Sequence, residues 1–151
     1  MVPRWRLRPA AEADRELLFR VRRDTMREYV DRTWGWDDAW QREHFDRTFD
    51  PAALSVIVVD GCDAGVLEAE VRASVVYLAN IQILPAFQSR GVGAAVVSDV
   101  VDRAGREGQT VELQVLKVNP ARRFYERLGF TVVGDTATHW RMVASAPSTE
   151  P

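Results

Sequence analysis

The chain has 151 residues and a net charge of −2, and it is 46% hydrophobic and 28% charged. This composition is that of a globular protein, and it excludes extensive disorder and the strongly basic surface of a nucleic-acid or anionic-membrane binder. Cys62 is the single cysteine, which excludes an internal disulfide, and the two histidines His44 and His139 have no metal-site spacing. We expect one domain over residues 1–144 and a disordered tail over 145–151. Without a signal pattern or a long apolar span, a cytoplasmic protein is expected.

The first third of the chain predicts one strand and two helices. Trp5–Arg8 alternates in polarity and reads as a strand. Asp14 is placed to cap a helix that carries apolar residues and a threonine on one face, namely Leu17, Leu18, Val21, Thr25 and Tyr29. The segment Thr33–Trp36 interrupts this pattern. Asp37 then opens a second helix, which ends near Asp50 because a proline follows.

The rest of the chain alternates between strands and helices. Runs at 54–59, 64–71 and 75–84 are separated by short turns and predict an antiparallel meander. A helix from Val92 to about Glu107 then leads to a strand at 111–115, which is typical of a parallel βαβ unit. A helix that begins at Pro120 and a hairpin around Gly134-Asp135 complete the chain. The predicted order is β-α-α-β-β-β-α-β-α-β-β, an α/β fold with a mixed sheet and helices on both faces.

The stretch Gln88–Ala95 joins a strand to a helix and contains two glycines, Gly91 and Gly93. Glycines allow positive φ and a close approach of the backbone, and the free N–H groups of a helix N-terminus attract anions. A phosphate site is therefore one interpretation, and an ordinary tight turn is the other. A dinucleotide fingerprint is excluded because Val96 stands where its third glycine should be, and a Walker loop is excluded because Ala94-Ala95 follows Gly93.

Two segments resemble the signature of the GCN5-related N-acetyltransferases. The first is Ile81-Gln-Ile-Leu-Pro-Ala-Phe-Gln-Ser-Arg-Gly-Val-Gly93, which is similar to the family's strand and Gln/Arg-x-x-Gly-x-Gly/Ala turn. The second is Asn119-Pro-Ala-Arg-Arg-Phe-Tyr-Glu-Arg-Leu-Gly-Phe130, which is similar to its Asn…Phe-Tyr-Glu-x-Leu-Gly-Phe segment. Asn119 stands six residues before Tyr125, where family members commonly have seven. With the element order, the resemblance covers about residues 3 to 143 and implies the acyl-CoA N-acyltransferase fold.

The resemblance implies acetyl-CoA as the donor and CoA as a product. It implies that backbone N–H groups of Ser89, Arg90, Gly91, Val92, Gly93 and Ala94 bind the pyrophosphate, with side-chain contacts from Gln88 and Arg90. The backbone of Ile81, Gln82 and Ile83 would pair with the pantetheine arm and polarise the thioester carbonyl. Asn119 would contribute to the cofactor site. Tyr125 would be the general acid that protonates the leaving thiolate, and the alternative is a tyrosine that only packs.

A general base is harder to identify. Some family members carry a glutamate at the position that matches Gln114, and glutamine cannot act as a base. Glu70 is our substitute, and Glu68, Glu28 and His139 are further candidates. Glu68 and Glu70 share one face of a strand, which faces either the cleft or solvent. For each of these side chains, an ordinary surface or structural use is the competing interpretation.

The acceptor side is expected to come from the early helices and the late hairpin. Trp34 and Trp36, with Trp40 nearby, could wall a pocket for a cationic or flat acceptor, or could simply cover the core. Gln82 and Gln114, inside otherwise apolar strands, need polar partners and could orient the acceptor or a water, and His139 is a further substrate candidate.

Three classes of function remain open. The first is an N-acetyltransferase in which an amine attacks acetyl-CoA directly through a tetrahedral intermediate. Its acceptor would be a small molecule or, alternatively, a protein N-terminus or lysine. The second is a non-catalytic acyl-CoA-binding regulatory domain, and the third is a protein-interaction domain. Family analogy also raises a homodimer, whereas no nucleic-acid or membrane partner is expected.

Overall fold

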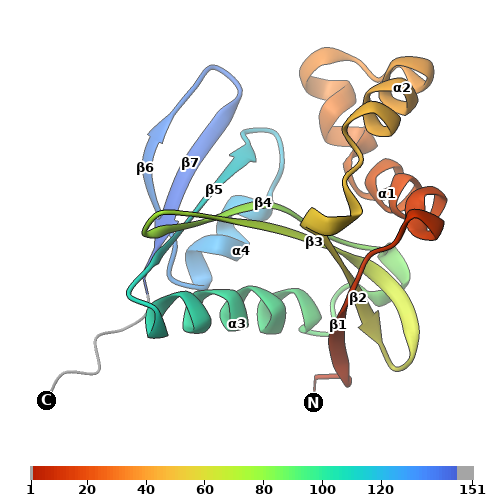
Figure 1. Ribbon diagram of the computed structural model, residues 1–151. Helices are drawn as coiled ribbons and strands as arrows, with labels where there is room; N and C mark the ends of the chain where they lie inside the picture. Colours follow the sequence, from red (N-terminus) through yellow and green to blue (C-terminus); the bar gives the residue numbers. More distant parts are fainter. Residues whose placement is uncertain (1, 146–151) are drawn as a thin grey trace, which may run out of the picture. The chain divides into compact units, whose positions relative to one another are not determined.

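The computed structural model describes residues 2–145, which form two compact units (Figure 1). The N-terminal unit contains the chain up to Glu68 together with Asn80–Gly93. The C-terminal unit contains Ala69–Ala79 and the chain from Ala94 onward. The single domain over residues 1–144 stays a prediction, and the predicted tail lies outside the described residues except for Ser145.

The described chain forms a mixed sheet with four α-helices. The strands are β1 (Trp5–Pro9), β2 (Leu54–Val59), β3 (Cys62–Arg72), β4 (Val75–Ile83), β5 (Thr110–Leu116), β6 (Thr131–Asp135) and β7 (His139–Ala144). The helices are α1 (Arg15–Trp34), α2 (Asp38–Thr48), α3 (Val92–Arg106) and α4 (Ala121–Arg127). Hydrogen-bonded strands follow the order β1-β2-β3-β4-β5-β7-β6. The predicted α/β class and element order are confirmed. Within residues 2–145, no helix is long and apolar enough to cross a membrane.

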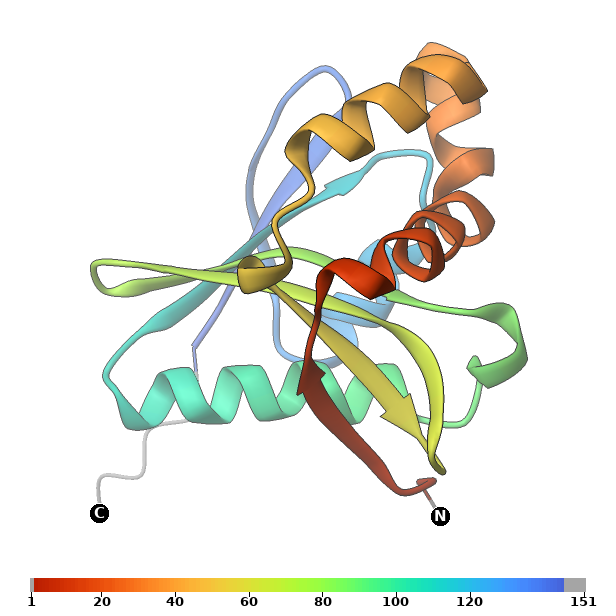
Figure 2. The ribbon, with the colours of Figure 1, turned by 45° about the vertical axis from the view of Figure 1, so that its right-hand side comes forward.

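The N-terminal unit contains β1, β2, the first part of β3 and the end of β4, together with α1 and α2 (Figure 2). β1 pairs antiparallel with β2, and β2 pairs antiparallel with β3. Leu18 and Val21 of α1 recur at helical spacing and pack against three valines of β2 and β3, namely Val56, Val58 and Val66. The rings of Phe19 and Phe45 meet edge-on with centroids 5.4 Å apart, which joins α1 to α2. This packing fixes α1 and α2 beside the strands β2 and β3.

The C-terminal unit contains the predicted parallel pair. Val75, Val76 and Tyr77 at the start of β4 pair in parallel with Thr110, Val111 and Glu112 of β5. The connection runs through α3, so the predicted βαβ unit is confirmed. β5 pairs antiparallel with β7, and β7 with β6. The parallel register covers the first three residues of β4, whereas the strand itself continues to Ile83.

Two local predictions are corrected by the structure. Asp14 does precede α1, but its carboxylate makes no capping bond to that helix. It accepts hydrogen bonds from Arg8 and from the Ala11 N–H, and the second bond caps the short 3-10 helix Glu12–Asp14 instead. The last hairpin does not turn at Gly134-Asp135, because both residues lie within β6 beside a register shift that begins at Val132. The turn falls at residues 136–138, where the Thr136 hydroxyl accepts hydrogen bonds from backbone N–H groups.

Candidate active site

The predicted donor site lies where β4 ends and α3 begins. After β4, Pro85–Phe87 forms a 3-10 turn, and the chain reverses through Ser89 and Gly91, whose φ angles are 63° and 83°. Positive φ is unfavourable for a residue with a side chain, and Gly91 avoids this strain. Gly93 needs no such freedom, because it lies in the first turn of α3. The expectation of positive φ at both glycines is therefore corrected to Gly91, with Ser89 as the second left-handed residue. The close approach of Gly93 to an anion stays a prediction.

The start of α3 is suited to an anion. The first turn of this helix carries no acidic side chain, and Arg90 precedes it as an exposed cation. The N–H groups of the first turn have no partner within a helix, and the helix dipole adds positive potential there. A pyrophosphate would find backbone donors at this turn without a repulsive charge. The residues present therefore fit the group that the resemblance implies.

Gln88 braces the same turn. Its side-chain Nε2 donates a hydrogen bond to the carbonyl oxygen of Ile83, at 2.7 Å. The amide thus ties the loop back to the end of β4, and this contact gives the side chain a structural role. Gly65 of β3 allows a close approach at the same place, since a Cβ atom there would lie only 2.2 Å from the carbonyl oxygen of Gln82.

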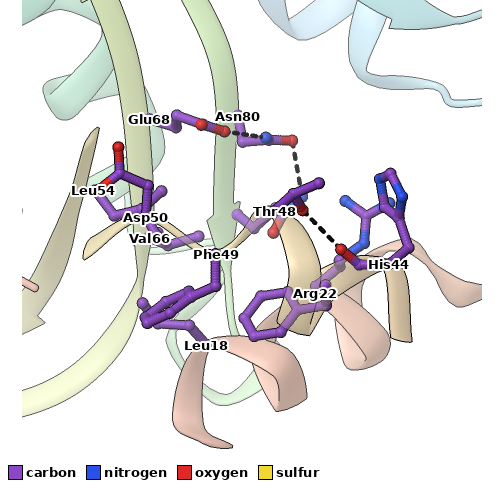
Figure 3. A pocket seen from close by; sticks show the side chains of 12 residues that line it. Leu18, Arg22, His44, Thr48, Phe49, Asp50, Leu54, Val66, Glu68 and Asn80 are labelled. Carbon is purple, nitrogen blue, oxygen red and sulfur yellow. Dashed lines mark hydrogen bonds between the residues drawn. The ribbon is translucent and has the colours of Figure 1, made fainter. Parts of the chain in front are cut away.

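A cavity of about 250 Å³ lies in the N-terminal unit, where the acceptor side is predicted (Figure 3). Strand residues Glu68, Asn80 and Gln82 and helix residues Arg22 and His44 contribute its polar lining. Asn80 Nδ2 donates to Glu68 Oε1 at 2.6 Å, and Gln82 Nε2 donates to Asn80 Oδ1 at 3.2 Å. Gln82 is thus buried with a protein partner, as its place in an apolar strand required. Glu68 is half-buried and lines this cavity. Of the two orientations that the sequence left open, its side chain therefore points toward a cavity and not into bulk solvent.

A second cavity, of about 540 Å³, lies beside the break between α1 and α2. Trp34 and Trp40 line it, together with Gln41, Asp37 and the two residues shared with the first cavity, Arg22 and His44. The Trp40 and His44 rings stack with centroids 4.9 Å apart and planes 6° from parallel. Asp37 caps α2 by accepting from the Trp40 N–H at 2.9 Å, as predicted.

Trp36, by contrast, is not among the residues that line this cavity. Its indole N–H donates to the carboxylate of Asp38, and its backbone N–H donates to Asp31. These bonds fix the Thr33–Trp36 break, so a structural use of Trp36 is the better interpretation. Trp34 and Trp36 were the two tryptophans predicted to contact the acceptor, and only Trp34 lines the cavity of about 540 Å³.

The remaining predicted site residues lie in the C-terminal unit. The Tyr125 ring packs edge-on against Phe130, with centroids 5.6 Å apart, and burial raises the pKa of its phenol to about 12. Asn119 uses its side-chain oxygen to accept from the Ala121 N–H at 2.9 Å, so this side chain serves the start of α4. Gln114 is exposed on β5 and shares a small surface cavity with His139.

Two further base candidates lie in the C-terminal unit. Glu70 is exposed, and the Arg72 guanidinium, at 2.8 Å, holds the pKa of its carboxyl below the usual range. Burial lowers the pKa of His139, whose Nδ1 lies 2.8 Å from the Thr138 hydroxyl. A carboxylate with a lowered pKa is a weaker base, so these contacts favour Glu68 over Glu70.

Sequence reasoning missed Arg22 and Gln41 as cavity residues. Arg22 lies four residues after Leu18 and three before Thr25, so it shares the packed face of α1. Gln41 is 5% exposed and lies four residues before Phe45 on α2. Helical spacing from the apolar residues could have found both of them, although polar side chains on a helix usually indicate solvent.

A family model described as the acetyltransferase (GNAT) family matches residues 18–130. A comparison with curated proteins gave no significant match. The structure is similar to the PaiA N-acetyltransferase of Thermoplasma acidophilum in complex with coenzyme A, at 14% identity and a TM-score of 0.77, over 95% of this chain and 99% of that chain.

Two further solved structures share the fold. An acetyltransferase from Thermus thermophilus is 21% identical with a TM-score of 0.73, over 95% of this chain and 98% of that chain. The ribosomal-protein-S18-alanine N-acetyltransferase of Escherichia coli is 17% identical with a TM-score of 0.68, over 98% of this chain and 99% of that chain. Because the family model covers most of the chain and the fold agrees, the chain belongs to the acetyltransferase (GNAT) family.

Proposed function

We propose that the protein is an N-acetyltransferase that moves acetyl from acetyl-CoA to the amine of a small molecule. The single observation that supports acetyl-CoA as the donor is the turn after β4. Ser89 and Gly91 are left-handed there, and the first turn of α3 that follows has no acidic side chain. Such a turn presents backbone N–H groups to a pyrophosphate. The similar PaiA structure is a complex with coenzyme A, which supports the same class of donor.

The backbone at the end of β4 is proposed to hold the pantetheine arm. The parallel register with β5 covers Val75, Val76 and Tyr77 only, whereas β4 continues to Ile83. An extended arm could add to a strand by main-chain hydrogen bonds, as peptides do at exposed strands. An N–H from Ile81 to Ile83 would then polarise the thioester carbonyl.

The reaction requires one proton to leave the amine and one to reach the sulfur. The amine nitrogen forms a bond to the acetyl carbonyl carbon, and the carbon–sulfur bond then breaks. We assign Glu68 as the group that takes the amine proton, because it is a half-buried carboxylate in the acceptor cavity. Tyr125 is proposed to protonate the CoA thiolate, since a tyrosine phenol carries its proton at neutral pH and is the side chain that the family resemblance places in this role.

A small acceptor is favoured by the size of the cavity beside Glu68. This cavity, of about 250 Å³, lies below the range of about 300–1,000 Å³ that is usual for drug-sized ligands, and the second cavity that shares Arg22 and His44 with it, of about 540 Å³, lies within that range. A protein acceptor is the second candidate, because the similar Escherichia coli structure is named for acetylation of a ribosomal protein. A non-catalytic acyl-CoA-binding domain would keep the turn without needing Glu68.

Calorimetry with acetyl-CoA, followed by a thiol-release assay over a panel of amines and short peptides, tests this proposal. We expect binding, and release of CoA with at least one small amine. Binding without release for any amine or peptide would indicate the regulatory domain. Absence of binding would overturn every reading that involves CoA.

A further inference from the structure

Arg22 is a half-buried cation that forms no direct ion pair with any of the described residues. No hydrogen bond or ion pair within residues 2–145 reaches its guanidinium, whereas Arg8, Arg15 and Arg42 each contact two carboxylates. Burial lowers the pKa of Arg22, and the charge of Glu68 offsets this only in part. A half-buried guanidinium is costly unless an anion pairs with it, so Arg22 lacks a partner that a ligand could supply.

Arg22 is also the cation shared by the two acceptor-side cavities. It lines the cavity that contains Glu68 and the cavity that contains Trp34 and Trp40 (Figure 3 shows the first). The carboxylates of the first cavity are already bonded: Glu68 accepts from Asn80 at 2.6 Å, and Asp50 accepts from the Ala52 N–H at 3.1 Å. These neutral donors leave the charge of Glu68 in place, and no ion pair within residues 2–145 joins Glu68 to Arg22. The cavity therefore presents one cation and one anion side by side, and a ligand that carries both an anion and an amine could pair with each of them.

The second cavity could hold the apolar part of the same ligand. The Oε1 atom of Gln41 is buried and has no donor within residues 2–145. Trp34 and Trp40 provide large apolar surfaces there, with 61% and 54% of each residue exposed. An apolar or aromatic group could cover these rings, and a donor on the ligand could satisfy Gln41.

We propose that the acceptor is an amino acid whose free carboxylate binds Arg22, whose amine lies toward Glu68 and whose apolar side chain enters the cavity of Trp34 and Trp40. This inference rests on the proposed function and narrows its acceptor. A guanidinium matches a carboxylate in a two-bond geometry, so Arg22 selects for this group. A peptide N-terminus has no free carboxylate beside its amine and would leave Arg22 unpaired.

The test uses amines that differ only in the anion. Phenylalanine, phenylalaninamide, phenethylamine and the aminophosphonate analogue of phenylalanine are assayed by thiol release, and their binding is measured by calorimetry. The proteins are wild type, Arg22→Met, Arg22→Lys and the control Arg20→Met, which removes an exposed cation from the same helix.

We expect wild type to prefer phenylalanine over its amide and over phenethylamine. Arg22→Met should weaken phenylalanine binding by about 10- to 100-fold, as loss of a charge-assisted hydrogen bond does. Arg22→Met should also no longer prefer phenylalanine over phenethylamine. Arg22→Lys should restore part of the affinity, and Arg20→Met should match wild type.

Three outcomes would overturn the inference. They are equal use of phenylalanine and phenethylamine by wild type, unchanged phenylalanine binding in Arg22→Met, and a preference for the aminophosphonate, which would assign Arg22 to a phosphate-type anion. Acetylation of phenethylamine with any of these results leaves the proposed function standing. Arg22-dependent binding of phenylalanine without any acetyl transfer would support the site and defeat the proposed function instead.

Discussion

The side-chain amide of Asn80 donates a hydrogen bond to the carboxylate of Glu68, with 2.6 Å between Nδ2 and Oε1. The bond joins β3 to β4 and holds the carboxylate in the acceptor cavity with an orientation set by the strands. A positioned carboxylate of this kind is what a general base requires.

Glu68→Gln should keep the shape and the Asn80 contact and remove the base. We expect kcat to fall by about 100-fold or more, the lower range for general acid–base catalysis, with little change in melting temperature. Glu70→Gln is the matched control on the same strand, because Glu70 is exposed and paired with Arg72. Steady-state kinetics at saturating acetyl-CoA measure both variants. If the Glu70 variant loses the activity and the Glu68 variant keeps it, the assignment of the base is wrong.

Tyr125→Phe should remove the proton donor and keep the ring packing against Phe130. We expect kcat to fall by about 10- to 100-fold, a modest effect for an acid because a thiolate is a tolerable leaving group. Affinity for acetyl-CoA, measured by calorimetry, should stay within about twofold, since the lost hydroxyl acts on the sulfur in the transition state. Phe124 lies in contact with Tyr125, so Phe124→Leu controls for changes in packing. An unchanged kcat in Tyr125→Phe would remove the acid role.

The raised pKa of Tyr125 predicts a pH dependence of stability. The folded pKa is about 12, whereas the phenol of an unfolded chain titrates near about 10. Between these values the unfolded state loses the proton and the folded state keeps it, so stability falls as pH rises. Denaturant unfolding from about pH 9 to 11.5 should show a steeper fall for wild type than for Tyr125→Phe. Parallel curves would mean that Tyr125 titrates as it does in water.

Gly91→Ala should damage the donor turn. The φ of 83° is unfavourable for alanine by about 1 kcal/mol, and the new methyl would lie 3.3 Å from a Val2 methyl group. Gly108→Ala is the control, because Gly108 also has a positive φ of 70° but open space around its Cα. Both variants should lose similar stability in denaturant, and only Gly91→Ala should bind acetyl-CoA more weakly. Equal affinity in the two variants would place the pyrophosphate elsewhere.

Arg22→Met should not destabilise the protein. The substitution removes a half-buried charge whose burial the charge of Glu68 offsets only in part and which forms no direct ion pair within residues 2–145, and it leaves an apolar side chain of similar length. The free energy of unfolding should therefore stay level or rise by about 1 kcal/mol. Arg8→Met is the contrast, because Arg8 joins Asp14 and Asp63 and its loss leaves two carboxylates without this partner. Urea unfolding of the two variants compares them. A clear loss of stability in Arg22→Met would show that the guanidinium has a structural partner.

The elements and the donor turn could be predicted because their signals are local. Helical spacing, the cap at Asp37 and the strand-turn-helix pattern around Gly91 each depend on a few neighbouring residues. The second left-handed residue of the turn could not be predicted, because Ser89 gives no sign of its positive φ in the sequence. The predicted place of the last turn was also wrong, since Gly134 and Asp135 pair with Arg141 and Trp140 within β6, just after a register shift at Val133.

The acceptor side could be predicted only in part, because it depends on pairing between distant segments. Glu68 was one of several acidic candidates until its hydrogen bond with Asn80 and its place in a cavity distinguished it. Asn119 resembles a cofactor residue in the sequence, whereas its side chain in the folded chain bonds the first N–H of α4. The sequence did not single out Arg22, because only the folded chain places it in the lining of two cavities without an ion pair within residues 2–145.

The most direct test of acetyl transfer follows an isotope-labelled acetyl group from acetyl-CoA to an amine by mass spectrometry. We expect wild type to transfer the label to the nitrogen of a small amine while releasing CoA, and Glu68→Gln to transfer it far more slowly. Label that stays on CoA with every amine offered, under conditions where acetyl-CoA is bound, would contradict the claim that this protein is an N-acetyltransferase.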